Sequence, residues 1–155
     1  GGMDAMVAVS AVGILSAVAI PAFMKYIRRS KTSEATINVR KLFDASVAYA
    51  DENGHFPPSA PITPAHAACV DGSSVKHVPD PKEWEHPTWQ ALNFALDDPH
   101  YYQYTYVSDG KSFTARANGD LNCDGNLSTF ERIGVRNDDG TVNGGAGIFF
   151  AQELE

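Results

Sequence analysis

Apolar and polar positions divide the chain into an apolar stretch, an amphipathic stretch, an irregular segment and a series of alternating segments. Residues 5–24 contain no charged side chain. At 1.5 Å per helical residue they form a helix roughly 30 Å long, which is about the thickness of a bilayer core. The basic residues follow this stretch rather than precede it, unlike in a cleaved signal peptide. The pattern therefore predicts a retained helix that is able to cross a membrane.

Helical periodicity continues beyond the apolar stretch. Small and apolar residues recur at steps of three and four and form one face. They are Ala35, Val39, Leu42, Ser46 and Tyr49, with Phe43, Val47 and Ala50 widening the face. Asn53 and Gly54 are the residue types that end helices in a left-handed conformation. We predict one helix over about residues 3–52 within an N-terminal region 1–54, apolar over 1–24 and amphipathic over 25–54.

The middle of the chain is irregular. Prolines are spaced too closely over residues 55–100 for long regular elements. A short helix over 88–94, starting just after Pro87, is the one regular element predicted there. We expect this segment to be a long, partly ordered surface connection, with most of its histidines at the surface.

The last third of the chain alternates in the manner of half-buried strands. Segments 101–107 and 111–117 flank a Ser-Asp-Gly turn and predict a β-hairpin. Further strands are predicted at 130–135 and 147–151. A long helix followed by a small antiparallel sheet is an α+β fold. In this arrangement residues 55–155 form a globular domain whose sheet covers the amphipathic half of the helix.

Charge is distributed unevenly along the chain. The formal net charge is −7, but residues 1–41 carry six Lys and Arg against two acidic residues, net +4, and residues 42–155 carry six against seventeen, net −11. An acidic domain argues against nucleic-acid binding, which requires clustered Lys or Arg. A basic cluster just past the apolar stretch fits either anionic lipid head groups or a solvated or inter-subunit face. It consists of Lys25, Arg28, Arg29 and Lys31.

The most specific local motif is a twelve-residue run that begins at Asp120. Side-chain oxygens fall at positions one, three, five, nine and twelve, with glycine at six and a backbone carbonyl at seven. The residues are Asp120, Asn122, Asp124, Gly125, Asn126, Ser128 and Glu131. A Ca²⁺ ion needs this spacing because the loop must surround one point with about six or seven oxygens. We expect a structural calcium site with Leu127 pointing into the core; the alternative is a polar hairpin loop without an ion.

Other candidate chemistry is limited. Cys69 and Cys123 are too few for a redox motif or a zinc site of known spacing, and they are expected to pair outside the cytoplasm; the alternative is two buried thiols. The histidines lack the i,i+4 spacing of a helical metal pair, and no nucleophile elbow is present. We therefore expect a protein that is not an enzyme. The aromatic residues are either core or a ligand surface; they are Trp84, Trp89, Tyr101, Tyr102, Tyr104 and Tyr106.

The N-terminal region closely resembles that of type IV pilins and the related pseudopilins of type II secretion. The most specific part is the run Gly13-Ile-Leu-Ser-Ala-Val-Ala-Ile-Pro21, and the run Arg29-Ser-Lys-Thr-Ser-Glu-Ala35 is similar to pilins of myxobacteria. The resemblance is strongest over residues 4–54. It implies a long helix carrying a globular antiparallel sheet, in agreement with the fold that the residue pattern predicts.

The resemblance also implies roles for individual residues. Asp4 stands where the family usually has a glutamate that neutralises the terminal amine of a neighbouring subunit. The chain begins with Gly1-Gly2 rather than with the family's usual phenylalanine. An unpaired carboxylate in such an apolar setting is costly. Gly13 and Pro21 correspond to the pair between which the helix often loosens in assembled filaments, since both residue types weaken helices.

The resemblance implies a homo-oligomeric helical filament, or pilus, on a bacterial surface. Before assembly by pilus or secretion machinery, the chain is expected in the inner membrane with its domain in the periplasm. Small residues in the apolar stretch then let neighbouring helices approach closely. Adhesion, motility and protein secretion are the functions that follow. The alternatives are a type II secretion pseudopilin and, from another class, a membrane-anchored calcium-binding module that does not polymerise.

Overall fold

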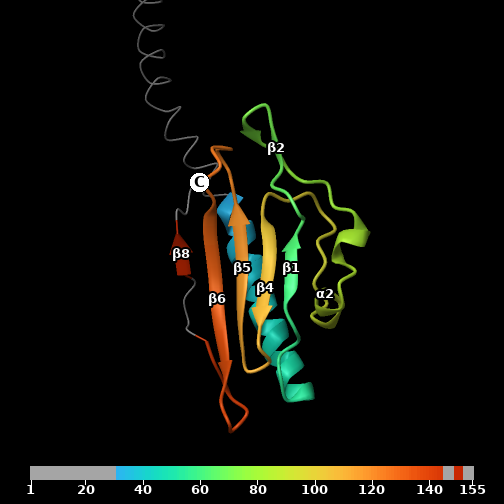
Figure 1. Ribbon diagram of the computed structural model, residues 1–155, viewed down its shortest axis with the longest axis vertical. Helices are drawn as coiled ribbons and strands as arrows, with labels where there is room; N and C mark the ends of the chain where they lie inside the picture. The colour runs from blue at the N-terminus through green and yellow to red at the C-terminus, as the bar shows by residue number, and fades with distance from the viewer. Residues whose placement is uncertain (1–30, 145–148, 152–155) are drawn as a thin grey trace, which may run out of the picture.

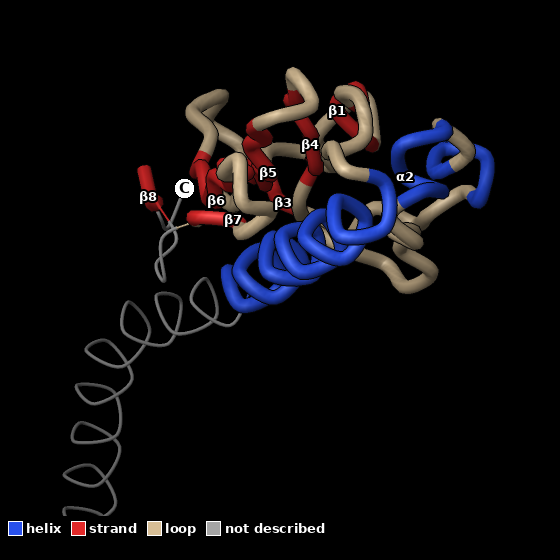
Figure 2. Tube along the Cα trace, turned by 90° about the horizontal axis from the view of Figure 1, so that it is seen from below, coloured by secondary structure: helices blue, strands red, loops and turns tan. Residues whose placement is uncertain are grey.

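A helix lies across one face of an antiparallel sheet in the computed structural model, which describes residues 31–144 and 149–151. The helix spans residues 31–53, and the strands stand side by side in front of it in Figure 1. Seen from below, the helix lies on one side of the strands (Figure 2), and the short helix α2 (Pro87–Ala91) lies beside its C-terminal half. The predicted α+β fold is confirmed.

The apolar half of the predicted helix lies outside the described residues. The same holds for the three residues to which the pilin resemblance gives roles in assembly, Asp4, Gly13 and Pro21. In the part of the chain that is described, no helix combines the length and the apolar character needed to cross a membrane.

The amphipathic half of the helix buries the face that its sequence predicts. Five of its residues have no exposed surface, namely Ala35, Val39, Leu42, Ser46 and Ala50. The helix also ends where expected. Gly54 has a φ of +80°, and its N–H donates to the carbonyl of Ala50 at 2.8 Å, which closes the last turn in the left-handed conformation that glycine favours.

The main sheet has the strand order β1-β4-β5-β6-β7, and β8 also pairs with β6. The strands are β1 (Ala60–Thr63), β4 (Gln103–Ser108), β5 (Ser112–Gly119), β6 (Ser128–Arg136), β7 (Val142–Asn143) and β8 (Phe149–Ala151). The predicted hairpin is β4–β5, in which Gln103 pairs with Asn118. The predicted strand at 130–135 is the middle of β6. The strand predicted at 147–151 is described from Phe149 on, as β8.

Five short elements were not predicted, one of which is β7. β1 carries a proline and lies at the edge of the sheet, where a missing backbone donor is tolerated. A separate two-stranded sheet joins β2 (Cys69–Val70) to β3 (Ser73–Ser74). A 3₁₀ helix, η1 (Pro81–Trp84), precedes α2 (Pro87–Ala91), which is the predicted short helix. These elements are too short for periodicity to reveal them.

The expectation of a loose surface connection over residues 55–100 is wrong, because this segment supplies part of the core. Its buried side chains are at most 5% exposed and include Phe56, Trp84, Trp89, Leu92, Phe94 and His100. The rings of Trp84 and Trp89 pack edge to face, with centroids 5.5 Å apart. Prolines prevent long regular elements here, but they do not prevent the aromatic side chains between them from reaching the core.

Gly119, the last residue of β5, packs directly against a buried tyrosine. A Cβ atom at this position would lie 2.4 Å from Cε1 of Tyr102, whose side chain is 1% exposed and has no space to move into. We expect Gly119→Ala to lower the free energy of unfolding by about 2 kcal/mol through overpacking, measured by urea denaturation. The exposed control Ser73→Ala should stay within about 0.5 kcal/mol of the wild type. Equal stability of Gly119→Ala and the wild type would contradict this close contact.

Candidate functional site

The predicted calcium loop connects β5 to β6. Its acidic residues are bound to backbone amides of the loop itself. The carboxylate of Asp120 accepts from the N–H groups of Asp124, at 3.1 Å, and Gly125, at 2.9 Å. Asp124 in turn accepts from the N–H of Asn126 at 2.8 Å. These contacts wind the loop around its own side-chain oxygens, and a φ of +87° at Gly125 permits the sharp turn.

The last two ligand positions predicted in the motif, nine and twelve, belong to strand β6 rather than to the loop. Ser128 is fully buried, and its hydroxyl donates to the carbonyl of Gly119 at 3.2 Å. Glu131 lies three residues further along β6 and forms an ion pair with Arg116 at 3.5 Å. Successive side chains of a strand point to opposite faces and rise by about 3.3 Å each. Ser128 and Glu131 therefore face opposite sides of the sheet, and the structure does not bring Glu131 into the loop.

The expectation that Leu127 points into the core is wrong. Its side chain is 40% exposed, and the buried leucine of the loop is Leu121, at 6% exposure. Leu127 is the eighth residue of the motif, and the inward direction expected of that residue belongs to calcium loops that lead into helices. Here position eight comes directly before β6, whose inward-facing residues are Ser128 and Phe130.

The first half of the loop fits a hard cation better than the second. Asp120, Asn122 and Asp124 offer carboxylate and amide oxygens, the donors that Ca²⁺ prefers. Within the described ranges, no group of three or more His, Cys, Asp or Glu side chains is arranged to hold a metal ion. An ion in this loop would therefore depend on asparagine, backbone and solvent oxygens in addition to the two aspartates.

A disulfide ties the loop to another part of the chain. Cys123 bonds to Cys69 of β2, with their Cα atoms 6.1 Å apart, across a sequence separation of 54 residues. The predicted pairing is present. The bond joins the β5–β6 connection to the β2–β3 hairpin, and both lie at the same end of the sheet in Figure 1.

A second polar cluster connects the helix to β4, and the sequence reasoning missed it. The carboxylate of Glu34 accepts hydrogen bonds from the N–H groups of Tyr101, at 2.7 Å, and Tyr102, at 3.0 Å. It also accepts from the hydroxyl of Tyr104 at 2.8 Å. That hydroxyl accepts in turn from the amide of Asn38 at 2.9 Å. One acidic residue at the start of the described helix thus fixes the start of β4.

Burial governs the titration of this cluster. The pKa of Glu34 is raised because loss of solvent outweighs the three hydrogen bonds and the nearby charge of Lys76, all of which favour the carboxylate. Burial, followed by the charge of Glu34, raises the pKa of Tyr104 well above its usual value. Further down the helix, the hydroxyl of Tyr106 donates to that of Ser46 at 2.9 Å. The alternating tyrosines of β4 were the available signal, because every second residue faces the helix.

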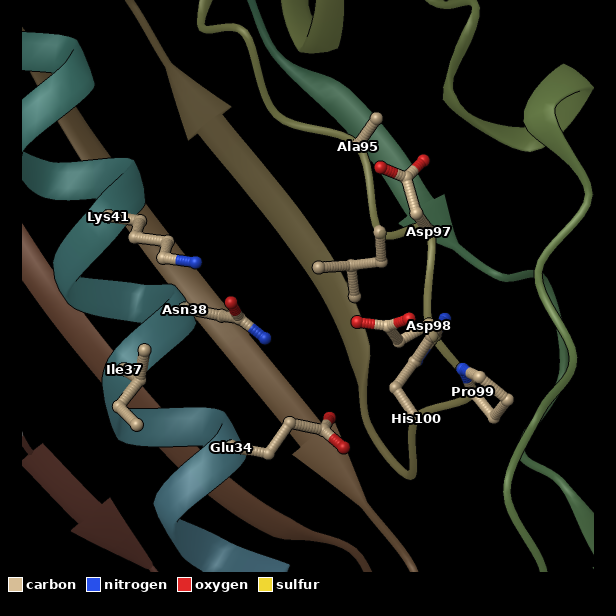
Figure 3. A pocket seen from close by; sticks show the side chains of 10 residues that line it. Glu34, Ile37, Asn38, Lys41, Ala95, Asp97, Asp98, Pro99 and His100 are labelled. Atoms are coloured by element: carbon tan, nitrogen blue, oxygen red, sulfur yellow. The ribbon is translucent and has the colours of Figure 1, made fainter.

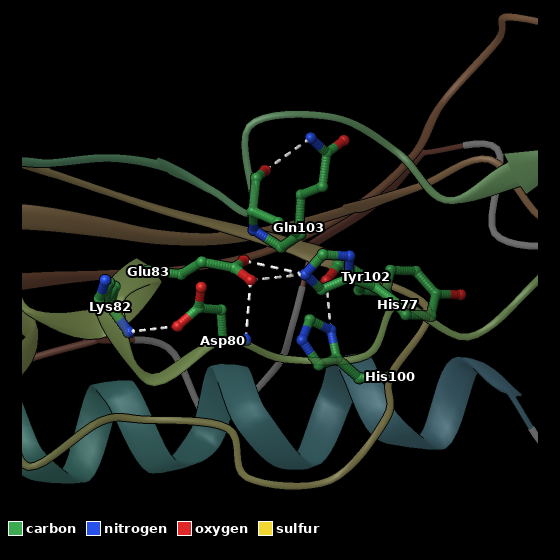
Figure 4. A network of polar contacts seen from close by, with 8 residues as sticks. His77, Asp80, Lys82, Glu83, His100, Tyr102 and Gln103 are labelled. Carbon is green, nitrogen blue, oxygen red and sulfur yellow. Dashed lines mark hydrogen bonds and ion pairs between the residues drawn. The ribbon is translucent and has the colours of Figure 1, made fainter.

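A histidine cluster fixes the segment before β4 (Figure 4). His77 and His100 pair through both backbone groups, with N···O distances of 2.7 and 3.1 Å. Nε2 of His77 lies 2.8 Å from the carboxylate of Glu83, which also receives the N–H of Asp80. His100 is 3% exposed, its Nδ1 lies 3.0 Å from the carbonyl of Tyr102, and burial lowers its pKa. His100 is thus a buried exception to the expectation that most of these histidines lie at the surface.

Comparison with known proteins gives a partial match to a pilin. The chain is 39% identical over 54 residues to the type IV major pilin protein PilA of Myxococcus xanthus (strain DK1622). This match covers 35% of the chain and 24% of that protein, so the chain spans about a quarter of the length of the curated relative it matches. No protein-family model matches the chain, and no solved structure matches it significantly. Together with the helix packed on an antiparallel sheet, the match supports a relationship to type IV pilins over part of the chain.

Proposed function

We propose that this chain is a structural subunit of a type IV pilus-like extracellular filament, that it polymerises through its apolar N-terminal stretch, and that it is not an enzyme. The similarity to a type IV major pilin carries this proposal. The fold is compatible with it, since the described helix presents one face to the sheet and follows the apolar stretch 5–24 in the sequence. Before assembly the subunit would rest in the inner membrane and be extracted by pilus or secretion machinery.

Electron microscopy of material sheared from cells that produce the full chain tests the proposal. Filaments should be present and should label with an antibody against the chain. Asp4→Ala should abolish them while the protein stays in the membrane fraction, because the carboxylate is proposed to neutralise the terminal amine of the next subunit. Asp51→Ala, on the exposed side of the helix, is the matched control and should leave filaments unchanged. Absence of filaments from the wild type would overturn the proposal.

The same experiment separates the two alternative functions. A type II secretion pseudopilin would give no long surface filaments, and its deletion would stop the export of secreted enzymes. A membrane-anchored calcium-binding module would give neither filaments nor a secretion defect.

We also propose that the β5–β6 loop binds Ca²⁺ as a structural clamp. The carboxylates of Asp120 and Asp124 and the side chain of Asn122 support this, since they lie in one wound loop. A ligand present at 100 times its dissociation constant stabilises the folded state by about 2.7 kcal/mol. We therefore expect added Ca²⁺ to raise the thermal midpoint relative to chelator-treated protein, measured by calorimetry.

Variants identify the ligands of such an ion. Asp124→Asn should remove most of the response to Ca²⁺, whereas the exposed control Asp44→Asn should keep it. Glu131→Gln should also keep most of it, because Glu131 faces Arg116 on the sheet. Loss of the response in Glu131→Gln would mean that β6 rearranges to close the site. If chelator has no effect and elemental analysis finds no calcium, the loop is a polar hairpin.

A further inference from the structure

Two hollows, which we together call the groove, lie between the helix and the segment that leads into β4. One hollow of about 380 Å³ lies between helix residues 34–41 and residues 95–100. A second hollow of about 170 Å³ lies between helix residues 45–52 and residues 91–93. The same two elements form both hollows, one after the other. Figure 3 shows side chains of the helix and of the opposing segment facing each other across the larger hollow.

The helix lines this groove with one continuous stripe, which we call the groove stripe. Its members are Glu34, Ile37, Asn38, Lys41, Ala45, Ala48, Tyr49 and Glu52. At 100° per residue these positions fall within a sector about 120° wide, beside the stripe that faces the sheet. Such a stripe is the surface against which a second helix packs lengthwise. The alanines permit close approach, and Ile37 keeps 54% of its surface exposed.

Acidic groups dominate the larger hollow. Asp97 and Asp98 lie on the opposing segment and Glu34 on the helix, against a single lysine, Lys41, in its lining. The chain beyond residue 41 repeats this imbalance, since residues 42–155 carry a net charge of −11. A cationic helix face therefore complements this groove in charge and in shape.

We propose that the groove binds the basic segment 22–30 of a second copy of this chain. Lys25, Arg28 and Arg29 are spaced by three and four positions, which places them on one face of a helix. They would lie against Asp97 and Asp98, with apolar neighbours of the segment against Ile37. The inference rests on the proposed filament function and names the surface through which neighbouring subunits hold one another outside the apolar bundle.

We assign the segment to the groove of a neighbouring copy rather than to the groove of its own chain. The helix is already formed at residue 31, so a chain that folds back must turn before that residue. Such a turn would place Arg28 and Arg29 within the reversal rather than along the groove.

Cross-linking between two tagged populations of the full chain in detergent tests the proposal. One population carries Arg28→Cys and the other Asp98→Cys, with the native disulfide intact, and a short bis-maleimide joins the new thiols. We expect a mixed adduct that carries both tags. Adding Asp97→Lys to the second population should lower its yield about tenfold, because a like charge then faces the cations. Adding Lys25→Glu to the first population should restore it, whereas the control Asp51→Lys, outside the groove stripe, should change nothing.

Electron microscopy is carried out on the cross-linking samples and on filaments assembled from the unmodified chain. It separates this inference from the filament proposal. Filaments without a mixed adduct, or an adduct insensitive to the charge changes, would overturn the docking site alone. Adducts that join only chains of the same population would overturn it as well. A charge-dependent mixed adduct without filaments would support the docking site and contradict the filament proposal.

Discussion

Replacing both cysteines, in the variant Cys69→Ser with Cys123→Ser, lowers the free energy of unfolding by about 4 kcal/mol. The bond closes a loop with a sequence separation of 54 residues, and a loop of this size removes much of the conformational entropy of the unfolded chain. β2 and β3 form their own sheet, separate from the main one. Without the bond, the β5–β6 connection also loses its covalent link to this hairpin.

Urea denaturation of the full chain, followed by the fluorescence of Trp84 and Trp89, measures this loss. Both indoles are buried, so both report unfolding of the core. Wild-type protein unfolded in the presence of a reductant should match the double variant, since it loses the same constraint. A difference below about 1 kcal/mol between the oxidised wild type and the double variant would show that the unfolded chain is compact enough to make the bond redundant.

Local periodicity accounts for the elements that the sequence predicts well. The helix stripe from Ala35 to Ala50 and the alternation of β4 and β5 depend on neighbours three to four, or two, positions away. One buried face is therefore enough to predict the helix and each of the two strands, and the structure buries those faces. The left-handed end of the helix at Gly54 is equally local.

Contacts between distant residues account for what the sequence does not predict. Trp89 is buried because its Nε1 donates to Thr63 and its ring packs on Trp84 and Phe94, and only the tertiary fold brings these residues together. The same holds for Glu34, whose three partners lie 67 to 70 positions away. A solvated acidic residue and a buried one look alike in a sequence.

The calcium motif shows a different limit. Its spacing describes side-chain oxygens along the chain, whereas the flanking elements decide where those oxygens point. A strand after the loop carries Glu131 away to Arg116, while a helix would turn a residue three positions on back toward the loop. The motif therefore predicts the wound first half of the loop and does not determine its second half.

Glu34→Ala lowers the free energy of unfolding by about 3 kcal/mol, because it leaves the N–H groups of Tyr101 and Tyr102 and the hydroxyl of Tyr104 without their shared acceptor. Removing a partly desolvated carboxylate recovers some free energy, but this gain is smaller than the loss of the three hydrogen bonds. Asp44→Ala, on the exposed side of the same helix, is the matched control and should change stability by less than about 0.5 kcal/mol.

The pH dependence of stability isolates the charge of Glu34 from its hydrogen bonds. Its pKa is raised on folding, so the folded protein binds more protons than the unfolded chain as the pH rises above about 4.5. The contribution of Glu34 is therefore fully present below the unfolded pKa and is lost as the pH rises through the folded pKa.

The variant Glu34→Gln tests this dependence, because its side chain cannot titrate. Urea denaturation from pH 4 to pH 8 gives the unfolding free energy of the wild type minus that of this variant. This difference should be most positive at the acidic end. A difference that grows toward neutral pH would mean that the hydrogen bonds of Tyr101, Tyr102 and Tyr104 outweigh desolvation, and that Glu34 holds the helix to β4 as a stabilised anion.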